Sequence, residues 1–425
     1  MKEELLQYIW QHGLFEQECL KTHKGETIQI ISRGQRNQDS GPDFFNARIR
    51  IGDTTWAGNV EVHINSSDWN KHKHSGNVAY DNVILHVVLK HDEEIRPSTQ
   101  KMIPSLELVP IQGIIERYEE LQDSRQNIAC QNKLQSLKAF EVSVFISRLS
   151  IERLEDKTET IKQTYLECNK DWHQTFQQQL FTSFGLKANT LPFTMLSRTL
   201  PHNILSKHCD NLLQIEALLF GQAGFLEEDY IDGYHKVLRD EYLFLRKKYN
   251  LNPMDKSVWK FMRMRPANFP TIRISQLAKL MHKRNNLISH TLNAKFIKEV
   301  EHILDTSATP YWEKHYSFGK ESEQKTKKLG SLTKRNILIN TIIPFMFFYA
   351  KERSKPKIQE KALRFLEELP SEKNTIIEEW GRHGIKSKSA FDSQALIQLM
   401  NRYCKNRKCL QCQIGSKVLK HNYLQ

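Results

Sequence analysis

Strand-like patterns are confined to the first 112 residues of this sequence, and this asymmetry is the feature that most constrains its fold. Short runs in that part are rich in β-branched residues or alternate between apolar and polar residues, and turn residues separate them. The run NVILHVVLKHD is nearly continuous in apolar residues, as expected of a strand that is buried on both faces. These patterns predict an opening amphipathic helix at 3–21 and strands at 25–34, 44–52, 54–64, 82–92 and 103–111.

Helical periodicity replaces the strand patterns from residue 113 onward. The predicted helices fall at 139–167, 172–184, 211–221, 229–248, 271–283 and 294–304. We therefore predict an α+β fold, in which an N-terminal helix and a small mixed β-sheet are followed by a mainly α-helical region. Its expected segments are an α/β domain at 1–112, a helical domain at 113–318, a charged linker at 319–335, and a helical C-terminal region with a cysteine tail at 336–425.

The charge and composition of the chain restrict its partners and its compartment. The formal net charge is +13, which favours a polyanionic partner, nucleic acid first and an anionic membrane surface second. The apolar run 337–350 is too short to span a bilayer and is interrupted by Pro344, so we expect a buried core helix and no membrane insertion. Seven cysteines without a secretory signal at the start of the chain predict a reducing, cytoplasmic location.

Three polar residues stand out in the segment SGPDFFNARIRIGDTTWAGNVEVH. Glu61 and His63 are two residues apart in an expected strand, so both side chains should lie on one face of the sheet. Pro42 removes a backbone donor and lets the chain turn Asp43 sideways. If the two strands pair as a hairpin, Asp43 approaches Glu61, and the two carboxylates would suit Mg²⁺ or Mn²⁺. His63 would then position or deprotonate a water.

A simpler interpretation of the same residues requires no ion. Gly-Pro-Asp is also a common turn sequence, in which the aspartate bonds its own backbone. Glu61 and His63 would then lie on a solvated face of the sheet. Both interpretations stay open from the residues alone.

The pattern resembles the PD-(D/E)XK nuclease superfamily, in which a helix precedes a strand with Pro-Asp and a strand with Glu-x-Lys. The matching residues are Pro42-Asp43 and Glu61-Val62-His63. The resemblance implies a restriction-endonuclease-like fold for about the first 100 residues and metal ligation by Asp43 and Glu61. The sequence departs from the pattern because His63 takes the place of the lysine, and because the connection after His63 is too short for the usual helix.

Further histidines follow the expected site. His72 and His74 lie in a loop, where they would contact a phosphate or a water, or join His63 as ligands of a borderline metal. His86 lies inside the apolar run Val-Ile-Leu-His-Val-Val, where a buried structural histidine is the plainer interpretation.

The C-terminal tail contains Cys404, Cys409 and Cys412 in a C-x4-C-x2-C arrangement. The spacing matches part of a plant-type iron–sulfur signature, which needs a fourth, distant cysteine. A zinc site completed by His383, His421 or another cysteine fits equally well. The scattered cysteines are expected to be small buried hydrophobes; these are Cys19, Cys130, Cys168 and Cys209.

Several arginines are candidate phosphate contacts. Arg33 and Arg36 come just before Asp43 in the sequence. Arg263, Arg265 and Arg273 surround an expected helix start and would form a phosphate clamp. The alternative is that these three arginines pair with acids and support the core.

Several longer stretches resemble a bacterial family, domain of unknown function 2851, which is found mainly in Bacteroidetes. The resemblance spans nearly the whole chain and implies no established activity. It rests on GPDFFNARIRIG, WAGNVEVHINSSDW, AYDNVILHVVLKHD, EALLFGQAGFL, RPANFPTIRISQLA and CLQCQIG.

These observations lead to one expected function and two alternatives. The leading prediction is a metal-dependent nuclease or nuclease-like phosphodiesterase that acts on DNA or RNA with Mg²⁺ or Mn²⁺. The first alternative is a non-catalytic nucleic-acid-binding or assembly protein on a degenerate nuclease fold. The second is a helical scaffold whose tail binds zinc and a protein partner.

Overall fold

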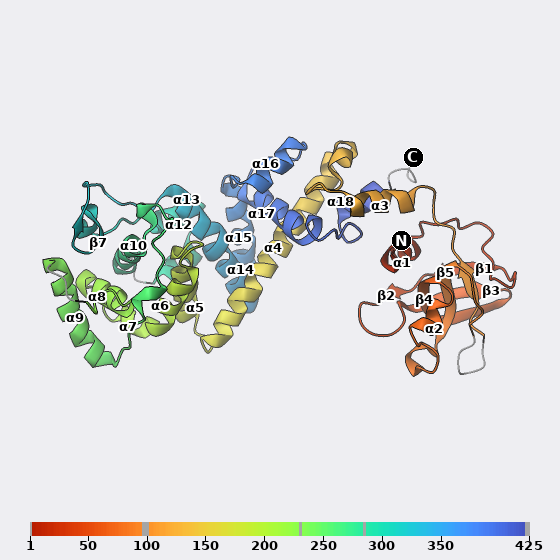
Figure 1. Ribbon diagram of the computed structural model, residues 1–425, viewed down its shortest axis with the longest axis horizontal. Coiled ribbons are helices and arrows are strands. Elements are labelled where there is room, and N and C mark those ends of the chain that lie inside the picture. Colours follow the sequence, from red (N-terminus) through yellow and green to blue (C-terminus); the bar gives the residue numbers. More distant parts are fainter. Residues whose placement is uncertain (1, 96–101, 229–231, 284–285, 421–425) are drawn as a thin grey trace. The chain divides into compact units, whose positions relative to one another are not determined.

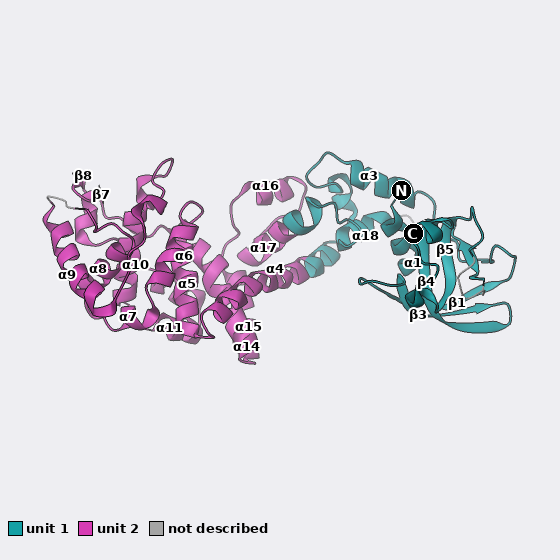
Figure 2. Ribbon diagram, turned by 60° about the horizontal axis from the view of Figure 1, so that its bottom comes forward, with its two compact units in different colours: residues 1–145, 399–425 teal, residues 146–398 magenta. Residues whose placement is uncertain are grey.

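The computed structural model describes residues 2–95, 102–228, 232–283 and 286–420. Contacts divide the chain into two compact units (Figure 2). Unit 1 combines residues 1–145 with 399–425, and unit 2 consists of residues 146–398. The expected segment boundaries at residues 112, 318 and 335 were placed where the sequence pattern changes. The division by contacts instead places the two ends of the chain in one unit.

Unit 1 contains a small mixed sheet, as predicted (Figure 1). Its strand order is β1-β3-β4-β5-β6, with β2 also beside β3. The pairs β1–β3 and β3–β4 are antiparallel, whereas the pairs β4–β5 and β5–β6 are parallel. The strands are β1 Ile28–Ser32, β2 Gln35–Arg36, β3 Phe44–Ile51, β4 Thr54–Asn65, β5 Val83–Lys90 and β6 Ser105–Glu107.

Helix α1 (Glu3–His12) covers one face of this sheet (Figure 1). Its apolar side chains share a core with Phe44, Val60 and Val62. The expectation that the helix continues to residue 21 is wrong, because Gly13 adopts a left-handed conformation (φ 64°) and ends it. The connection between β4 and β5 contains only the short helix α2 (Asp68–Lys71) and a 3-10 turn (Val78–Tyr80), in agreement with its expected shortness.

A bulge in β3 decides which face of the sheet Asp43 uses. Phe44 pairs with Val60 but Ala47 pairs with Gly58, so β3 has one more residue than β4 between these pairs. Asn46 adopts a left-handed backbone conformation (φ 57°), which accommodates the extra residue of the bulge. Phe44 and Ala47 can therefore both face the core, and Asp43, next to Phe44, lies opposite Glu61 on the other face.

The C-terminal segment completes unit 1. Tyr8 of α1 hydrogen-bonds Ser416 (2.5 Å), and Arg117 Nε donates to the Leu419 carbonyl (3.1 Å). Val418 and Leu419 join the core under the sheet. The elements involved are α3 (Ile114–Asp123), the 3-10 segment Gln131–Ser136, the first residues of α4 (Ala139–Glu167), the π-helical segment Leu399–Cys404 and α18 (Gln413–Lys420).

Unit 2 is mainly helical around one apolar core, as the sequence predicts, with a small hairpin of β7 (His315–Ser317) and β8 (Lys320–Glu321). The stretch expected as a charged linker includes β8 and the buried Lys327, which donates to the Glu313 carbonyl (2.9 Å). The helices of unit 2 besides α4 are α5 Trp172–Phe184, α6 Thr190–Thr199, α7 His202–Ser206, α8 Leu212–Gln222, α9 Gly233–Tyr249, α10 Pro270–Lys283, α11 Leu287–Asn293, α12 Ile297–Ile303, α13 Ser331–Ile337, α14 Ile343–Glu352, α15 Pro356–Glu368, α16 Thr375–Arg382 and α17 Ala390–Gln398.

The apolar run at 337–350 is buried, as predicted. It begins at the end of α13, passes through a π-helical turn (Leu338–Ile342) and continues as α14. Pro344 has no backbone N–H, which is consistent with the local change in helix type just before it. Within the described part of the chain, no helix has the length and apolar character that crossing a bilayer demands.

Candidate metal centre

Side chains from the residue before β3, from β4 and from the loop after α2 meet on the sheet face opposite the Val60 and Val62 side chains. Asp43 precedes β3, Glu61 and His63 lie on β4, and His72 and His74 follow α2. The structure therefore brings the predicted acids together with three histidines in one cluster. We call the five residues Asp43, Glu61, His63, His72 and His74 the carboxylate–histidine cluster.

The two acids are fixed by reciprocal bonds across the β3–β4 pair. The Asp43 backbone N–H donates to Glu61 Oε2 (3.0 Å), and the Val62 N–H donates to Asp43 Oδ2 (3.0 Å). Gln7 of α1 donates to Asp43 Oδ1 (2.8 Å), and Arg36 Nη2 donates to Gln7 Oε1 (3.0 Å). These contacts orient both carboxylates and leave Glu61 Oε1 directed at the histidines.

The three histidines converge on Glu61. His74 Nε2 lies 3.3 Å from Glu61 Oε1, and His63 Nε2 lies 3.5 Å from the same oxygen. His63 Nε2 also lies 3.1 Å from His72 Nδ1. One ligand nitrogen from each histidine falls within 4.8 Å of the other two, as required of groups that could share one cation.

His86 supports the cluster from the neighbouring strand β5. Its Nε2 lies 2.8 Å from His63 Nδ1, and both side chains are buried. If His63 carries its proton on Nδ1 and donates to His86, the lone pair on His63 Nε2 faces the cluster. This arrangement is typical of a metal-binding histidine that a second residue orients. The buried structural histidine expected at this position therefore contacts the candidate site directly.

Burial and mutual repulsion change the acidity of these groups. Burial, together with the nearby Glu61 charge, raises the pKa of Asp43 to about 7. Burial likewise raises the pKa of Glu61 to about 7. Burial lowers the pKa of His63 to about 2, with a smaller contribution from His86 and the other histidines. The metal-free cluster therefore holds neutral imidazole at His63 and carboxyl groups that titrate near neutrality.

Sequence reasoning missed three contributors to this site. Glu3 of α1 lies close enough to Asp43 for burial and that charge to raise the pKa of Glu3 to about 7. Gln7 holds Asp43, as described above. Tyr80 stacks on His74, with ring centroids 3.9 Å apart. The apolar spacing of α1 predicted its buried face, but nothing in that spacing indicated which polar residues reach the sheet.

The predicted arginine contacts divide between the units. Arg36 holds Gln7 at the candidate site, whereas the Arg33 side chain lies beside Gly13. Arg263 and Arg265 belong to unit 2 and are exposed. Arg273 is only 3% exposed, so its expected place in a surface phosphate clamp is wrong. Its guanidinium instead donates to Asn268, Gln276 and Thr333, which fixes it inside unit 2.

The cysteine tail lies in unit 1. Cys404 ends the π-helical segment, and Cys409 and Cys412 lie between it and α18. Cys130 is half-buried and packs against the apolar core of unit 1, in line with its expected role as a small hydrophobe, and Cys409 packs against the same core. Cys19 is exposed, contrary to the same expectation.

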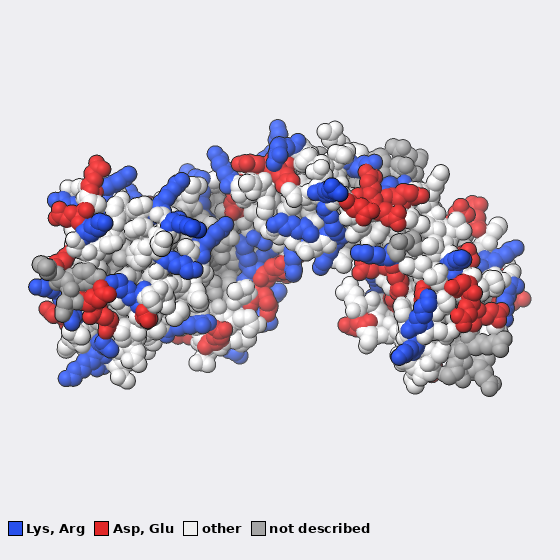
Figure 3. Space-filling view, in the orientation of Figure 1, with Lys and Arg blue, Asp and Glu red and all other residues white. Residues whose placement is uncertain are grey.

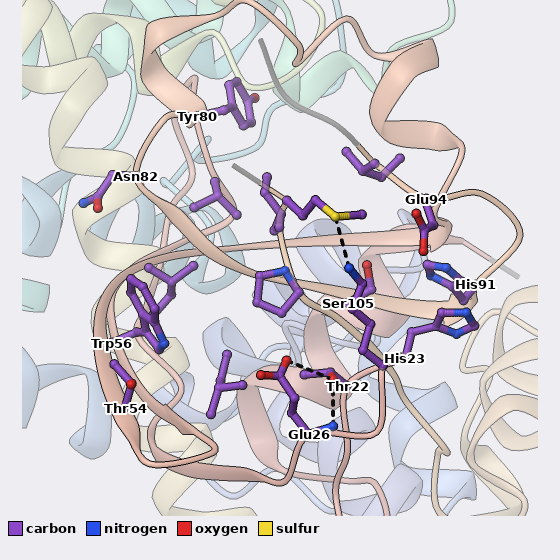
Figure 4. Close-up of a pocket in the computed structure, with 18 of the residues that line it drawn as sticks. Thr22, His23, Glu26, Thr54, Trp56, Tyr80, Asn82, His91, Glu94 and Ser105 are labelled. Atoms are coloured by element: carbon purple, nitrogen blue, oxygen red, sulfur yellow. Dashed lines mark hydrogen bonds between the residues drawn. The ribbon is translucent and has the colours of Figure 1, made fainter. Parts of the chain in front are cut away.

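A cavity of about 510 Å³ lies elsewhere on unit 1 (Figure 4). Trp56 and Asn82 line it, as do His23 and His91, whose rings stack with centroids 3.7 Å apart. None of the predicted site residues lines this cavity. Tyr80 is shared by the cavity and the carboxylate–histidine cluster, because it lines the cavity and stacks on His74.

The positive charge of the chain is unevenly distributed along the sequence. Unit 2 carries 40 Lys and Arg against 29 Asp and Glu, whereas unit 1 carries 22 against 20. On the face that Figure 3 shows, basic and acidic side chains are interspersed in each unit. The net positive charge therefore belongs mainly to the helical unit.

The fold and the site define the class of this protein: an α+β protein whose mixed sheet carries a carboxylate–histidine cluster and whose second unit is helical. A sequence model of the family described as "Protein of unknown function (DUF2851)" matches residues 3–375, and the chain belongs to this family. The matched residues include the whole carboxylate–histidine cluster and end before the cysteines of the tail. No curated protein and no solved structure gives a match.

Proposed function

We propose that this protein is a metal-dependent phosphodiesterase that cleaves nucleic acid at the carboxylate–histidine cluster of unit 1. The observation that carries the proposal is the convergence of His63 and His74 on Glu61 Oε1, next to the anchored Asp43 carboxylate. Carboxylate oxygens together with imidazole nitrogens suit Mn²⁺ better than Mg²⁺, which prefers oxygen ligands alone. Mn²⁺ is therefore the cofactor that we propose first, with Zn²⁺ as the other cation that fits the donors.

The bound cation would lower the pKa of a water and neutralise charge on the scissile phosphate. Asp43 and Glu61 would hold it through their carboxylates, and His63 and His74 through Nε2. His63 was expected to act as the base, but its burial and its contact with His86 favour the role of a ligand. His72 is exposed, and we assign to it the transfer of the proton from the attacking water.

We assign the binding of nucleic acid to basic residues outside the carboxylate–histidine cluster. Unit 2 carries the excess of basic residues, and phosphate contacts by Lys and Arg supply most sequence-independent affinity for nucleic acid. Arg263 and Arg265 are exposed candidates for such contacts. The same distribution of charge fits the alternative of a non-catalytic nucleic-acid-binding protein, so cleavage has to be measured apart from binding.

The test uses the full-length chain with Mn²⁺ on supercoiled plasmid and on single-stranded DNA and RNA. Asp43→Asn and Glu61→Gln keep the shape of the side chain and remove its charge. Asp39→Asn is the matched control, because Asp39 lies in the same loop as Asp43 and is exposed. We expect cleavage by the wild type and by Asp39→Asn, and none by the other two variants.

Two outcomes contradict the proposal. Cleavage that survives both Asp43→Asn and Glu61→Gln would place the chemistry elsewhere. Binding of the substrates by a wild-type protein that cleaves none of them, with Mn²⁺ or Zn²⁺ present, would support the non-catalytic alternative.

A further inference from the structure

Five of the seven cysteines lie in unit 1, and four of them belong to the tail and to the segment after α3, although the first and the second of these four are 274 positions apart in the sequence. The electrostatic neighbours of the Cys404 thiol are Cys412, Cys130 and Cys409. Cys130 and Cys409 also pack against the same core, under the sheet. We call Cys130, Cys404, Cys409 and Cys412 the four-thiol site.

Arg407 fixes the tail loop to the chain segment that leads to Cys130. Its Nη2 donates to the carbonyls of Gln126 (2.8 Å) and Ser124, and Gln122 Nε2 donates to the Arg407 carbonyl (3.0 Å). Its Nη1 donates to the Cys404 carbonyl (3.4 Å). One arginine thus holds Cys404 and the 122–126 segment together, and a guanidinium beside thiols favours their ionised form.

The turn around Cys409 and Cys412 is tightly wound. The Cys412 N–H donates to the Cys409 carbonyl (3.3 Å), and the N–H groups of Gly415 and Ile414 are directed at the Cys412 sulfur. A Cβ atom at Gly415 would lie 2.2 Å from the Cys409 carbonyl oxygen, so this position requires glycine. Backbone N–H groups that point at a sulfur stabilise a thiolate and are a recognised influence on metal–sulfur centres.

All seven cysteines are free of disulfide bonds, so no disulfide competes with a metal for the four thiols of this site.

We propose that the four-thiol site binds an iron–sulfur cluster, which cross-links the tail to the segment after α3. The spacing C-x4-C-x2-C plus one distant cysteine is the ligand pattern of a plant-type cluster. We assign Cys130 as the distant member, because it packs against the same core as Cys409 and follows the segment that Arg407 holds. The proposal does not depend on the carboxylate–histidine cluster, since it uses different residues and a different class of metal centre.

The spacing favours a cluster over a single zinc ion, because C-x4-C-x2-C with a distant fourth cysteine is the plant-type iron–sulfur pattern. A zinc ion held by the same four thiols is the competing occupant, and the metal analysis below distinguishes the two.

The experiment is metal analysis of the full-length protein purified without oxygen. Iron, acid-labile sulfide, zinc and visible absorption are measured for the wild type, for Cys130→Ser and for Cys19→Ser. Cys19→Ser is the matched control because Cys19 is exposed and lies in the same unit. We expect a brown wild type and a brown Cys19→Ser protein, each with iron and sulfide, and a Cys130→Ser protein that loses its colour and its sulfide.

Three results would overturn the proposal: a colourless wild type with stoichiometric zinc, a wild type that takes up neither iron nor sulfide on reconstitution, and a Cys130→Ser protein with the colour of the wild type. The first two need no variant, so they decide the matter even if Cys130→Ser fails to fold. Asp43→Asn should keep the iron and the sulfide, which separates this inference from the proposed nuclease activity.

Discussion

Glu61 Oε1 lies 3.3 Å from His74 Nε2, yet this buried nitrogen makes no aligned hydrogen bond with any described residue. Buried polar atoms normally have a hydrogen-bond partner, so such a pair calls for a physical explanation. A cation between the carboxylate oxygen and the imidazole nitrogen would satisfy both atoms without a hydrogen bond. The relationship therefore gives the proposed metal centre its most direct test.

Glu61→Gln should weaken Mn²⁺ binding by more than the roughly 10–100-fold loss that is typical of residues that only orient a ligand. The reason is that the amide keeps the shape of the side chain but removes the negative charge nearest His63 and His74. Isothermal titration calorimetry of wild type, Glu61→Gln and Asp39→Asn measures the effect. Equal affinity in all three proteins would show that the cation binds without Glu61.

His86→Leu should weaken Mn²⁺ binding by about 10–100-fold while the fold is retained, because His86 orients His63 without itself joining the cluster. Leucine fills a comparable volume in a strand that is otherwise apolar. The metal affinity and the thermal unfolding temperature are measured together. A large loss of stability with unchanged affinity would make His86 a core residue only, as the sequence first suggested.

Mn²⁺ affinity should rise as the pH rises toward neutrality and level off above that point. Asp43 and Glu61 have pKa values of about 7 in the folded, metal-free protein, so below that pH the cation must displace protons from them. Each displaced proton makes the affinity fall roughly tenfold per pH unit below the pKa. His63 adds nothing in this range, since its pKa is about 2. Calorimetric titrations at several pH values measure the slope, and an affinity that does not change with pH would contradict ligation by these two acids.

The same shifts determine the sign of the effect on stability without metal. The folded pKa of about 7 exceeds the ordinary values of 3.8 for Asp43 and 4.5 for Glu61, so the native state binds more protons than the unfolded state between those limits. This contribution to the free energy of unfolding is therefore present in acid and decreases as the pH rises to about 7. Denaturant titrations at several pH values, with a chelator present, compare the wild type with Asp43→Asn. A pH dependence that is identical in the two proteins would count against the assignment to this pair.

The sequence predicted which strands carry the carboxylate–histidine cluster better than it predicted which residues contribute to it. Period-2 alternation placed Glu61 and His63 on one face, and the hairpin argument brought Asp43 to Glu61, because both follow from local geometry. Glu3, Gln7 and Tyr80 were missed because tertiary packing brings them to the site, and neither spacing nor composition reports such packing. Arg273 was misjudged for the same reason: an arginine at a helix start looks free until the residues that bury it are known.

Arg273→Ala should destabilise unit 2 by about 2–4 kcal/mol, because it leaves the buried acceptor on Gln276 and the half-buried acceptor on Asn268 without this donor. Arg263→Ala combined with Arg265→Ala should instead leave stability almost unchanged, since both side chains are exposed. If the exposed pair contacts phosphate, the double variant also lowers the salt dependence of single-stranded DNA binding by about 1–2 units of log–log slope. Unfolding by denaturant and binding at several salt concentrations separate the two roles. An unaltered slope would remove these two arginines from the proposed interface.

Asn46 gives the last test, because its left-handed conformation (φ 57°) supports the bulge that places Asp43 opposite Glu61. Asn46→Gly should be tolerated, whereas Asn46→Val should destabilise the protein by about 1–2 kcal/mol, because a β-branched side chain strains this conformation. The Asn46→Val protein could also relax by losing the bulge, and the register would then turn Asp43 toward the core. We therefore expect Asn46→Val to lose Mn²⁺ affinity and Asn46→Gly to keep it, as measured by calorimetry beside unfolding. Equal Mn²⁺ affinity in a destabilised Asn46→Val protein would mean that Asp43 reaches its position without the bulge.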